Sequence, residues 1–198
     1  STSQCVVGAI LGIGLASRDT EYGGLIKVVL CWIGTPIGSM FFAILSFEGL
    51  AFFLRRIPLG LLSRDRFLWM GLLVCGCYGA YALGANNVAN TTGMFSGLIP
   101  GVTDEMLTLV GGLAIAGGTL SFSKRVMLNV GRGIMRLDAF TALAAVLGMS
   151  ITVHVFAMLG APVSTSQGIV GSILGIGLLR GAQGVRFDVL KKIAVGWV

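Results

Sequence analysis

Long stretches of this chain carry no charged side chain, and this feature constrains its fold more than any other. Asp, Glu, Lys and Arg are absent from Val28–Phe47, Phe67–Thr103, Met106–Ser123 and Ala139–Leu179. An α-helix that crosses the hydrocarbon core of a bilayer needs about 20 mostly apolar residues. Because each stretch reaches or approaches that length, the sequence predicts an all-α, polytopic transmembrane helical bundle.

Composition excludes several other classes of protein. Charged residues make up 11% of the 198 residues and the mean hydropathy is +0.92, whereas an ordinary soluble domain is about 25% charged. We therefore exclude a soluble enzyme, a disordered chain and a nucleic-acid binder. The net charge of +6 is explained by basic loops beside membrane spans. The 31 glycines allow membrane helices to approach closely or to break.

The basic residues predict the orientation of the spans, because loops rich in Lys and Arg stay on the cytoplasmic side. The loop at Pro100–Glu105 carries acids and no base, so it is expected on the external side. Phe67–Pro100 and Ala139–Gly160 would then cross outward, and Met106–Ser123 and Pro162–Leu179 would return. The expected cytoplasmic clusters are Arg55, Arg56, Arg64 and Arg66; Lys124, Arg125, Arg132 and Arg136; and Arg180, Arg186, Lys191 and Lys192.

Two polar segments interrupt the apolar runs. Phe67–Thr103 is too long for one straight crossing and short for two, and its middle, Gly84–Gly93, is polar and poor in helix formers. We expect a broken or re-entrant helix there, making one net crossing, and a second non-helical break at Ala161–Gln167. The two breaks should meet inside the bundle, because buried carboxamides and hydroxyls find partners nowhere else at that depth.

The start of the chain recurs near its end. Ser1–Leu15 and Ser164–Leu178 are identical at 12 of 15 positions. We expect five crossings between the two copies, and an odd number places them in opposite orientations. Inverted repeats with discontinuous helices are typical of secondary transporters, whose substrate sites lie near the midplane. Residues 1–66 are thus expected to hold the end of a first repeat and residues 67–198 a second, truncated one. We expect the chain to be a fragment lacking most of the first half.

The two polar segments offer complementary chemistry. Asn86, Asn87 and Asn90 lie three or four residues apart or adjacent, so they offer amide donors to an anion and carbonyl oxygens to a hard cation. Pro162 precedes the hydroxyl cluster at 164–166 and predicts a helix start. Free N–H groups and the positive end of the helix dipole there favour an anion. The structural alternatives are a simple helix cap and amides that only join helices.

These motifs resemble those of the inorganic phosphate transporter (PiT) family, which carries G-A-N-[DN]-x-A-N and P-V-S-T-[ST]-[HQ] once in each half. The chain matches the first at Gly84–Asn90 and the second at Pro162–Gln167, and Ser1–Gln4 match the tail of the first-half copy. The resemblance implies symport of inorganic phosphate with Na⁺ or H⁺ by an integral, multi-pass protein of the plasma membrane. Asn87 stands where relatives often have Asp, and Gln4 and Gln167 stand where many have His.

Site residues follow from this resemblance together with the chemistry of the motifs. No residue is assigned a catalytic role, and the expected partners are inorganic phosphate, a monovalent cation, the lipid bilayer and a second copy of the chain in a homodimer, with no resident cofactor. Na⁺ is expected near Asn87 and Asn90, and cation coupling is also assigned to Asn86, Gln167 and Gln4. Phosphate binding is assigned to Asn86, Asn90, Ser164, Thr165, Ser166, Ser1, Thr2 and Ser3.

Other functions remain open at this point. A sulfate or other oxyanion permease of the same family is the nearest alternative, followed by an anion channel with carboxamide-lined filters. An intramembrane hydrolase would pair Ser164 with His154, the single histidine, although it leaves the duplicated motif unexplained. We interpret His154 instead as a residue that hydrogen-bonds within the bundle.

Overall fold

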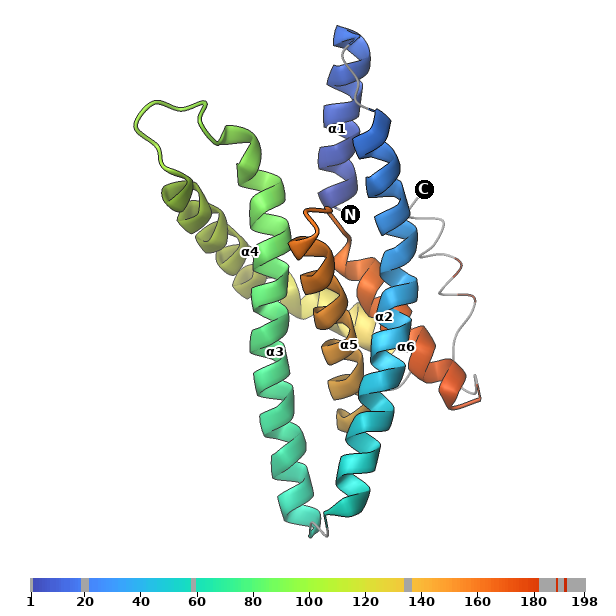
Figure 1. Cartoon of the computed structure of the whole chain (residues 1–198). Helices are drawn as coiled ribbons and strands as arrows, with labels where there is room; N and C mark the ends of the chain where they lie inside the picture. The colour runs from blue at the N-terminus through green and yellow to red at the C-terminus, as the bar shows by residue number, and fades with distance from the viewer. Residues whose placement is uncertain are drawn as a thin grey trace.

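The computed structural model describes residues 2–18, 22–57, 60–133, 137–181, 188 and 191, with no side chain described for Tyr22 or residues 125–133. Helices make up nearly all of this part of the chain, which confirms the all-α prediction (Figure 1). Their bounds are α1 Thr2–Ser17, α2 Tyr22–Arg56, α3 Leu61–Thr92, the 3-10 helix η1 Gly93–Phe95, α4 Asp104–Gly133, α5 Ala139–Met158 and α6 Thr165–Leu179.

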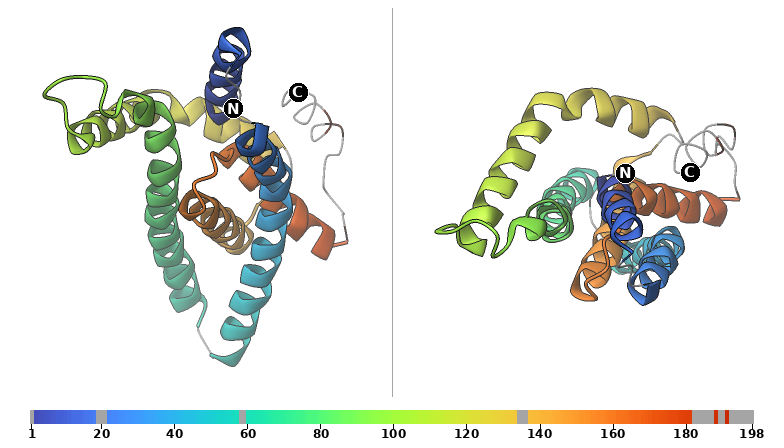
Figure 2. Two further views of the ribbon diagram at one scale, coloured as in Figure 1. Left: turned by 45° about the horizontal axis from the view of Figure 1, so that its top comes forward. Right: turned by 90° about the horizontal axis from the view of Figure 1, so that it is seen from above.

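Within the described residues, α2, α3, α4 and α5 are long and apolar enough to cross a membrane. The helices α2, α3, α5 and α6 form the bundle, while α4 leans away and packs mainly against α3 (Figure 2). α6 has 15 residues, or about 22 Å at 1.5 Å per residue. That length is less than a bilayer core of about 30 Å, so α6 as described is shorter than the full crossing expected of it.

The expected break at Gly84–Gly93 is wrong, because α3 continues without interruption to Thr92. The polar side chains there find partners while the helix stays intact. Thr91 Oγ1 and Thr92 Oγ1 donate to carbonyl oxygens four residues earlier, at 2.9 and 2.8 Å. Asn86 instead reaches a different segment of the chain. The intact helix therefore already provides hydrogen-bond partners for these polar side chains.

The second expected break exists but is shorter than predicted. α5 ends at Met158, Gly160 adopts a positive φ of 66°, and residues 161–164 are non-helical. α6 then begins at Thr165, so Thr165–Gln167 is helical rather than broken. Ser164 fixes this start, because its hydroxyl accepts a hydrogen bond from the Gln167 N–H at 3.4 Å. This is the N-cap arrangement favoured by serine.

α1 and α6, which carry the duplicated sequence, begin beside each other and run toward opposite ends of the molecule (Figure 1). Ser3 Oγ donates to the carbonyl oxygen of Val163 at 2.9 Å, so the start of α1 contacts the break that precedes α6.

Three described arginines gather at one end of the fold. Arg55 from α2, Arg64 from α3 and Arg180 after α6 line one cavity, whereas the loop before α4 lies at the opposite end (Figure 1). Two other described basic residues, Arg18 after α1 and Lys27 near the start of α2, lie away from this cavity, so the orientation of the spans stays a prediction. The side chains of Arg125 and Arg132, and all of Arg136, Arg186 and Lys192, lie outside the described residues.

Glycine allows α2 to touch α5 and α6 backbone to backbone. A Cβ added at Gly171 of α6 would overlap the Pro36 carbonyl, and one at Gly148 of α5 would overlap the Ala43 backbone. A Cβ at Gly175 would meet Met40 Cγ at 2.7 Å. Small residues at such contacts are how membrane helices gain packing energy, since lipid is as apolar as the helix faces.

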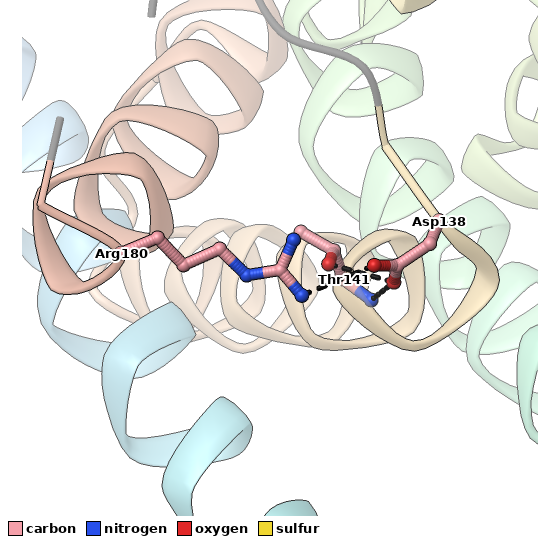
Figure 3. A network of polar contacts seen from close by, with 3 residues as sticks. All are labelled: Asp138, Thr141 and Arg180. Carbon is pink, nitrogen blue, oxygen red and sulfur yellow. Dashed lines mark hydrogen bonds and ion pairs between the residues drawn. The ribbon is translucent and has the colours of Figure 1, made fainter. Parts of the chain in front are cut away.

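The outer ends of α5 and α6 are tied together by an ion pair. Arg180 reaches from the end of α6 to Asp138, with 3.0 Å between Nη2 and Oδ2 (Figure 3). Asp138 also caps α5, because its Oδ1 accepts from the N–H and the hydroxyl of Thr141, both at 2.7 Å. Burial opposes ionisation of Asp138, but these bonds and the Arg180 charge outweigh it and lower its pKa below the ordinary value.

Gly171→Ala should destabilise the bundle by about 1–3 kcal/mol, the usual cost of overpacking a close contact. Gly49→Ala is the matched control, because this helical glycine has nothing near the added Cβ. The midpoint of thermal unfolding in detergent, followed by circular dichroism, should fall for Gly171→Ala and stay equal or rise for Gly49→Ala. Equal midpoints for both variants would contradict the close contact between α2 and α6.

Asp138→Ala should lower the free energy of unfolding by about 1 kcal/mol through loss of the cap. Asp138→Asn should cost less, because asparagine also caps helices and the ion pair is partly exposed, so it contributes little.

The stability that the Asp138 charge provides should depend on pH. Because its pKa is lowered in the folded protein, the charge contributes fully to stability above the ordinary value of 3.8, and this contribution is lost as the pH falls through the lowered pKa. The difference in unfolding midpoint between the parent and Asp138→Asn should therefore vanish in acid; a difference that widens in acid would contradict it.

Candidate functional site

The non-helical backbone at residues 161–164 forms the centre of the candidate site. Side chains from three other helices bind its polar groups. Trp32 Nε1 of α2 donates to the Pro162 carbonyl oxygen at 2.9 Å. The Val163 carbonyl oxygen accepts from Ser3 Oγ of α1 at 2.9 Å and from Asn86 Nδ2 of α3 at 2.8 Å. Buried backbone groups of this kind must be paired, and here side chains replace the missing helical partners.

Asn86 binds Val163 with both ends of its carboxamide. Its Nδ2 donates to the Val163 carbonyl oxygen, and its Oδ1 accepts from the Val163 N–H at 3.2 Å. Its side chain is 3% exposed. The same Nδ2 also lies 3.2 Å from Asn87 Oδ1. The expected meeting of the Asn-rich and hydroxyl-rich segments inside the bundle is thus confirmed, with Asn86 acting as the link between them.

Asn90 extends the cluster to α1, one turn of α3 beyond Asn86. Its Nδ2 donates to Ser3 Oγ at 3.2 Å, and the same Ser3 hydroxyl donates to Val163. Ser3 is 1% exposed, whereas Asn87 and Asn90 are half-buried. The two half-buried carboxamides are therefore the members of this cluster that keep access to space outside the protein interior.

The hydroxyl groups at the start of α6 differ in their exposure: one is buried and caps the helix, and two are accessible to a ligand. Ser164 is buried and caps the helix, and its Oγ lies 2.9 Å from Ser166 Oγ. Thr165 is half-buried and Ser166 is exposed. The first N–H groups of an α-helix have no intrahelical partner and carry the positive end of its dipole. Because the first turn of α1 lies beside this point, the N-terminus of α6 faces a region that holds neutral hydrogen-bond donors.

Gln167 and Ser39 each keep a polar atom without a partner. Gln167 is 5% exposed, and its Oε1 has no hydrogen-bond partner among the described residues. Ser39 of α2 is fully buried, and its Oγ is likewise unpaired. Buried polar atoms are normally bonded, so each atom is suited to a water molecule or an ion.

The remaining expected residues are placed as follows. Thr2 is exposed and Gln4 is half-buried, both in the first turns of α1, and Ser1 lies outside the described residues. Sequence reasoning missed Trp32 and Lys27, whose Nζ donates to the Leu159 carbonyl oxygen at 2.9 Å. Both lie just after the duplicated segment, where only a weak likeness between the copies could have drawn attention to them.

His154 is engaged within the bundle, as interpreted from the sequence. Its Nδ1 lies 2.9 Å from Tyr78 OH, and its ring makes edge-to-face contacts with Tyr78 and Tyr81. In the described part of the chain the Ser164 hydroxyl contacts Ser166 and the Gln167 N–H. The two members of the hydrolase hypothesis thus bind other groups, which removes its structural support.

Comparison with known proteins gives matches along the whole chain. It is 28% identical over its full length to a protein of Methanocaldococcus jannaschii named "putative phosphate permease", and 30% identical over its full length to the sulfate permease CysP of Bacillus subtilis. It spans 62% and 55% of the length of these two relatives. A solved structure titled "The sodium-dependent phosphate transporter" matches with a TM-score of 0.69 and 20% identity, over 87% of this chain and 62% of that one. This last match shows a shared fold.

A family model gives the assignment. Residues 62–198, well over half of the chain, match the model described as "Phosphate transporter family". The match confirms the family that the Asn-rich and hydroxyl-rich motifs resemble, and it agrees with the four span-length helices. The chain therefore belongs to the phosphate transporter family, as an integral, multi-pass membrane protein.

Proposed function

We propose that this chain forms part of a secondary transporter that carries inorganic phosphate across a membrane together with Na⁺ or H⁺. The observation that carries the proposal is the convergence of Ser3, Asn86 and Asn90 on the backbone of Val163, at the start of α6. This arrangement joins both copies of the duplicated motif to the Asn-rich helix at one buried point. Family membership supports phosphate as the substrate class.

The anion would bind at the N-terminus of α6, beside the first turn of α1. Its hydrogen-bond donors would be Asn90, Thr165, Ser166 and Thr2, together with the first backbone N–H groups of α6. Ser3, Ser164 and Asn86 are buried, and their polar groups hold the segments together. We therefore assign these three to positioning. Asn90 and Thr165 are half-buried, and the Asn90 amide keeps a second N–H besides the one directed at Ser3, so we assign both to direct contact. Helix N-termini can bind an anion without a neighbouring Lys or Arg, and secondary transporters use them in this way.

The cation would use carboxamide oxygens. Asn87 is half-buried beside Asn86, and Gln167 keeps a buried oxygen without a partner among the described residues. Both are hard neutral oxygens of the kind that bind Na⁺, and neither titrates, so H⁺ would require another carrier. The name of the structural neighbour supports Na⁺. The inverted repeat, its division after residue 66, the plasma-membrane location and a homodimer belong to this proposal as well.

Sulfate is the second candidate substrate, because a relative 30% identical to this chain is named a sulfate permease. Uptake of radiolabelled phosphate, measured against competing sulfate in cells that express the whole transporter of which this chain forms part, separates the two. If phosphate is the substrate, its uptake should saturate and should need a Na⁺ or H⁺ gradient. A tenfold excess of sulfate should leave most of this uptake intact. Uptake without saturation would favour a channel, and complete inhibition by sulfate would favour a sulfate permease.

Asn90→Ala and Thr165→Ala should each weaken phosphate binding by about tenfold or more. A hydrogen bond to a charged group contributes roughly 1.5–3 kcal/mol, and 1.4 kcal/mol corresponds to tenfold in affinity. Thr91→Ala is the matched control, because Thr91 neighbours Asn90 but its hydroxyl bonds to its own helix at 2.9 Å. Phosphate dependence of uptake gives the apparent affinities. Unchanged affinity in both site variants would mean that these residues only hold helices together.

Asn87→Asp should strengthen the cation side of the site, since a carboxylate is the better ligand for a hard cation. The concentration of Na⁺ that gives half-maximal uptake should fall, while the apparent affinity for phosphate declines through repulsion. Thr92→Asp serves as the control for an added charge on the same helix, because Thr92 lies just over one turn away and packs toward α4. An identical Na⁺ dependence in the parent and Asn87→Asp would argue against a cation at this position.

A further inference from the structure

A cavity of about 300 Å³ lies at the basic end of the bundle, far from the candidate site. It is an open cavity lined by the end of α2, the start of α3, the start of α5 and the residue that follows α6. It lies near one end of the 20-residue α5, while the break at 161–164 follows the other end, about 30 Å away along the helix. Its walls are Phe47, Ala51, Leu54, Phe140, Arg55, Arg64 and Arg180.

All the charged residues that line this cavity are positive. Three of its seven lining residues are arginines from three different elements, and none is an Asp or Glu. A neighbouring cavity of about 400 Å³ shares Arg64 and Arg180 but is also lined by Asp65 and Asp138, so its charges balance. The smaller cavity therefore differs from its neighbour in having positive side chains but no negative side chain in its walls.

One of the three arginines is held in place by the protein. Arg180 donates to Asp138, and its guanidinium lies 5.6 Å from the centre of the Phe47 ring. Within the described residues the ion pair found is this one, and it engages neither Arg55 nor Arg64. These two guanidinium groups therefore keep their planar sets of donors, which match the oxygens of a phosphate. Phe47 and Phe140, with ring centres 5.0 Å apart, form an apolar wall beside them.

We propose that this cavity binds a phosphate group, as a second anion site distinct from the one between α1 and α6. The arginines would form charge-assisted, bidentate hydrogen bonds to the phosphate oxygens. Basic pockets between membrane helices on the cytoplasmic side bind lipid head groups, and the phenylalanine wall suits the apolar part of an anionic lipid. Free inorganic phosphate offers the same anionic oxygens as a lipid head group. The inference does not depend on the transport function proposed above.

The test compares two double variants that remove the same charge from the same helix ends. Arg55→Gln with Arg64→Gln changes the cavity. Arg56→Gln with Arg66→Gln is the matched control, because neither residue lines the cavity and Arg56 stacks outward on Phe52, 4.6 Å from its ring centre. Native mass spectrometry counts phosphatidylglycerol and phosphatidylcholine molecules that remain bound to each purified protein. A thermal shift with inorganic phosphate forms the second arm.

The site is supported if the cavity variant alone loses at least tenfold of its bound phosphatidylglycerol, with phosphatidylcholine unaffected. It is also supported, with free phosphate as the ligand, if the cavity variant alone loses a phosphate-induced thermal shift. Phosphate that binds at the distant candidate site would raise the unfolding temperature of both variants equally, so it does not affect the difference between them. Equal behaviour of the two variants in both arms overturns the proposal. If the double cavity variant does not fold, Arg64→Gln against Arg66→Gln gives the same comparison with one charge.

Discussion

The unpaired backbone of residues 161–164 is the constraint on which the rest of this structure depends. A non-helical segment in the interior of a membrane bundle leaves N–H and C=O groups that lipid cannot satisfy. The fold answers with side chains from three helices: Ser3 of α1, Trp32 of α2 and Asn86 of α3. Each of these helices is thereby fixed against the α5–α6 turn. The same requirement explains why Asn86 is buried, since its carboxamide reproduces both hydrogen bonds that a neighbouring strand would offer to Val163.

Close packing of α2 supports this arrangement from the side. Gly148 of α5 and Gly171 of α6 leave room for the α2 backbone itself, at Ala43 and Pro36. At the far end of the same hairpin, Asp138 and Arg180 tie the start of α5 to the end of α6. The α5–α6 hairpin is therefore held at its turn by side-chain hydrogen bonds and along its length by contact with α2, while the partly exposed ion pair at its open end adds little. A turn held this firmly can keep the N-terminus of α6 pointed at a fixed place, which a helix-dipole anion site requires.

The two ends of the bundle carry different kinds of polar group. Around Val163 the side-chain donors Ser3, Asn86 and Asn90 are uncharged, so the anion site proposed there would bind and release its ligand without desolvating a permanent charge. At the basic end, Arg55, Arg64 and Arg180 place full charges around a cavity. Permanent charges cost little free energy next to lipid head groups because the interface is wet.

The sequence by itself determined the helical membrane class, the duplicated segment, the family and the position of the break after α5. These follow from uncharged stretches, from identity between Ser1–Leu15 and Ser164–Leu178, and from Pro162 before a hydroxyl cluster, all of which are local. The sequence wrongly predicted a helix break in the Asn-rich segment, because polar composition alone cannot show whether a carboxamide pairs with its own helix or with another segment. Only the tertiary structure placed Asn86 against Val163, so that one break serves both motifs and α3 stays intact. It also brought in Trp32 and Lys27 and the arginine-lined cavity, since residues distant in sequence become neighbours only once the helices pack.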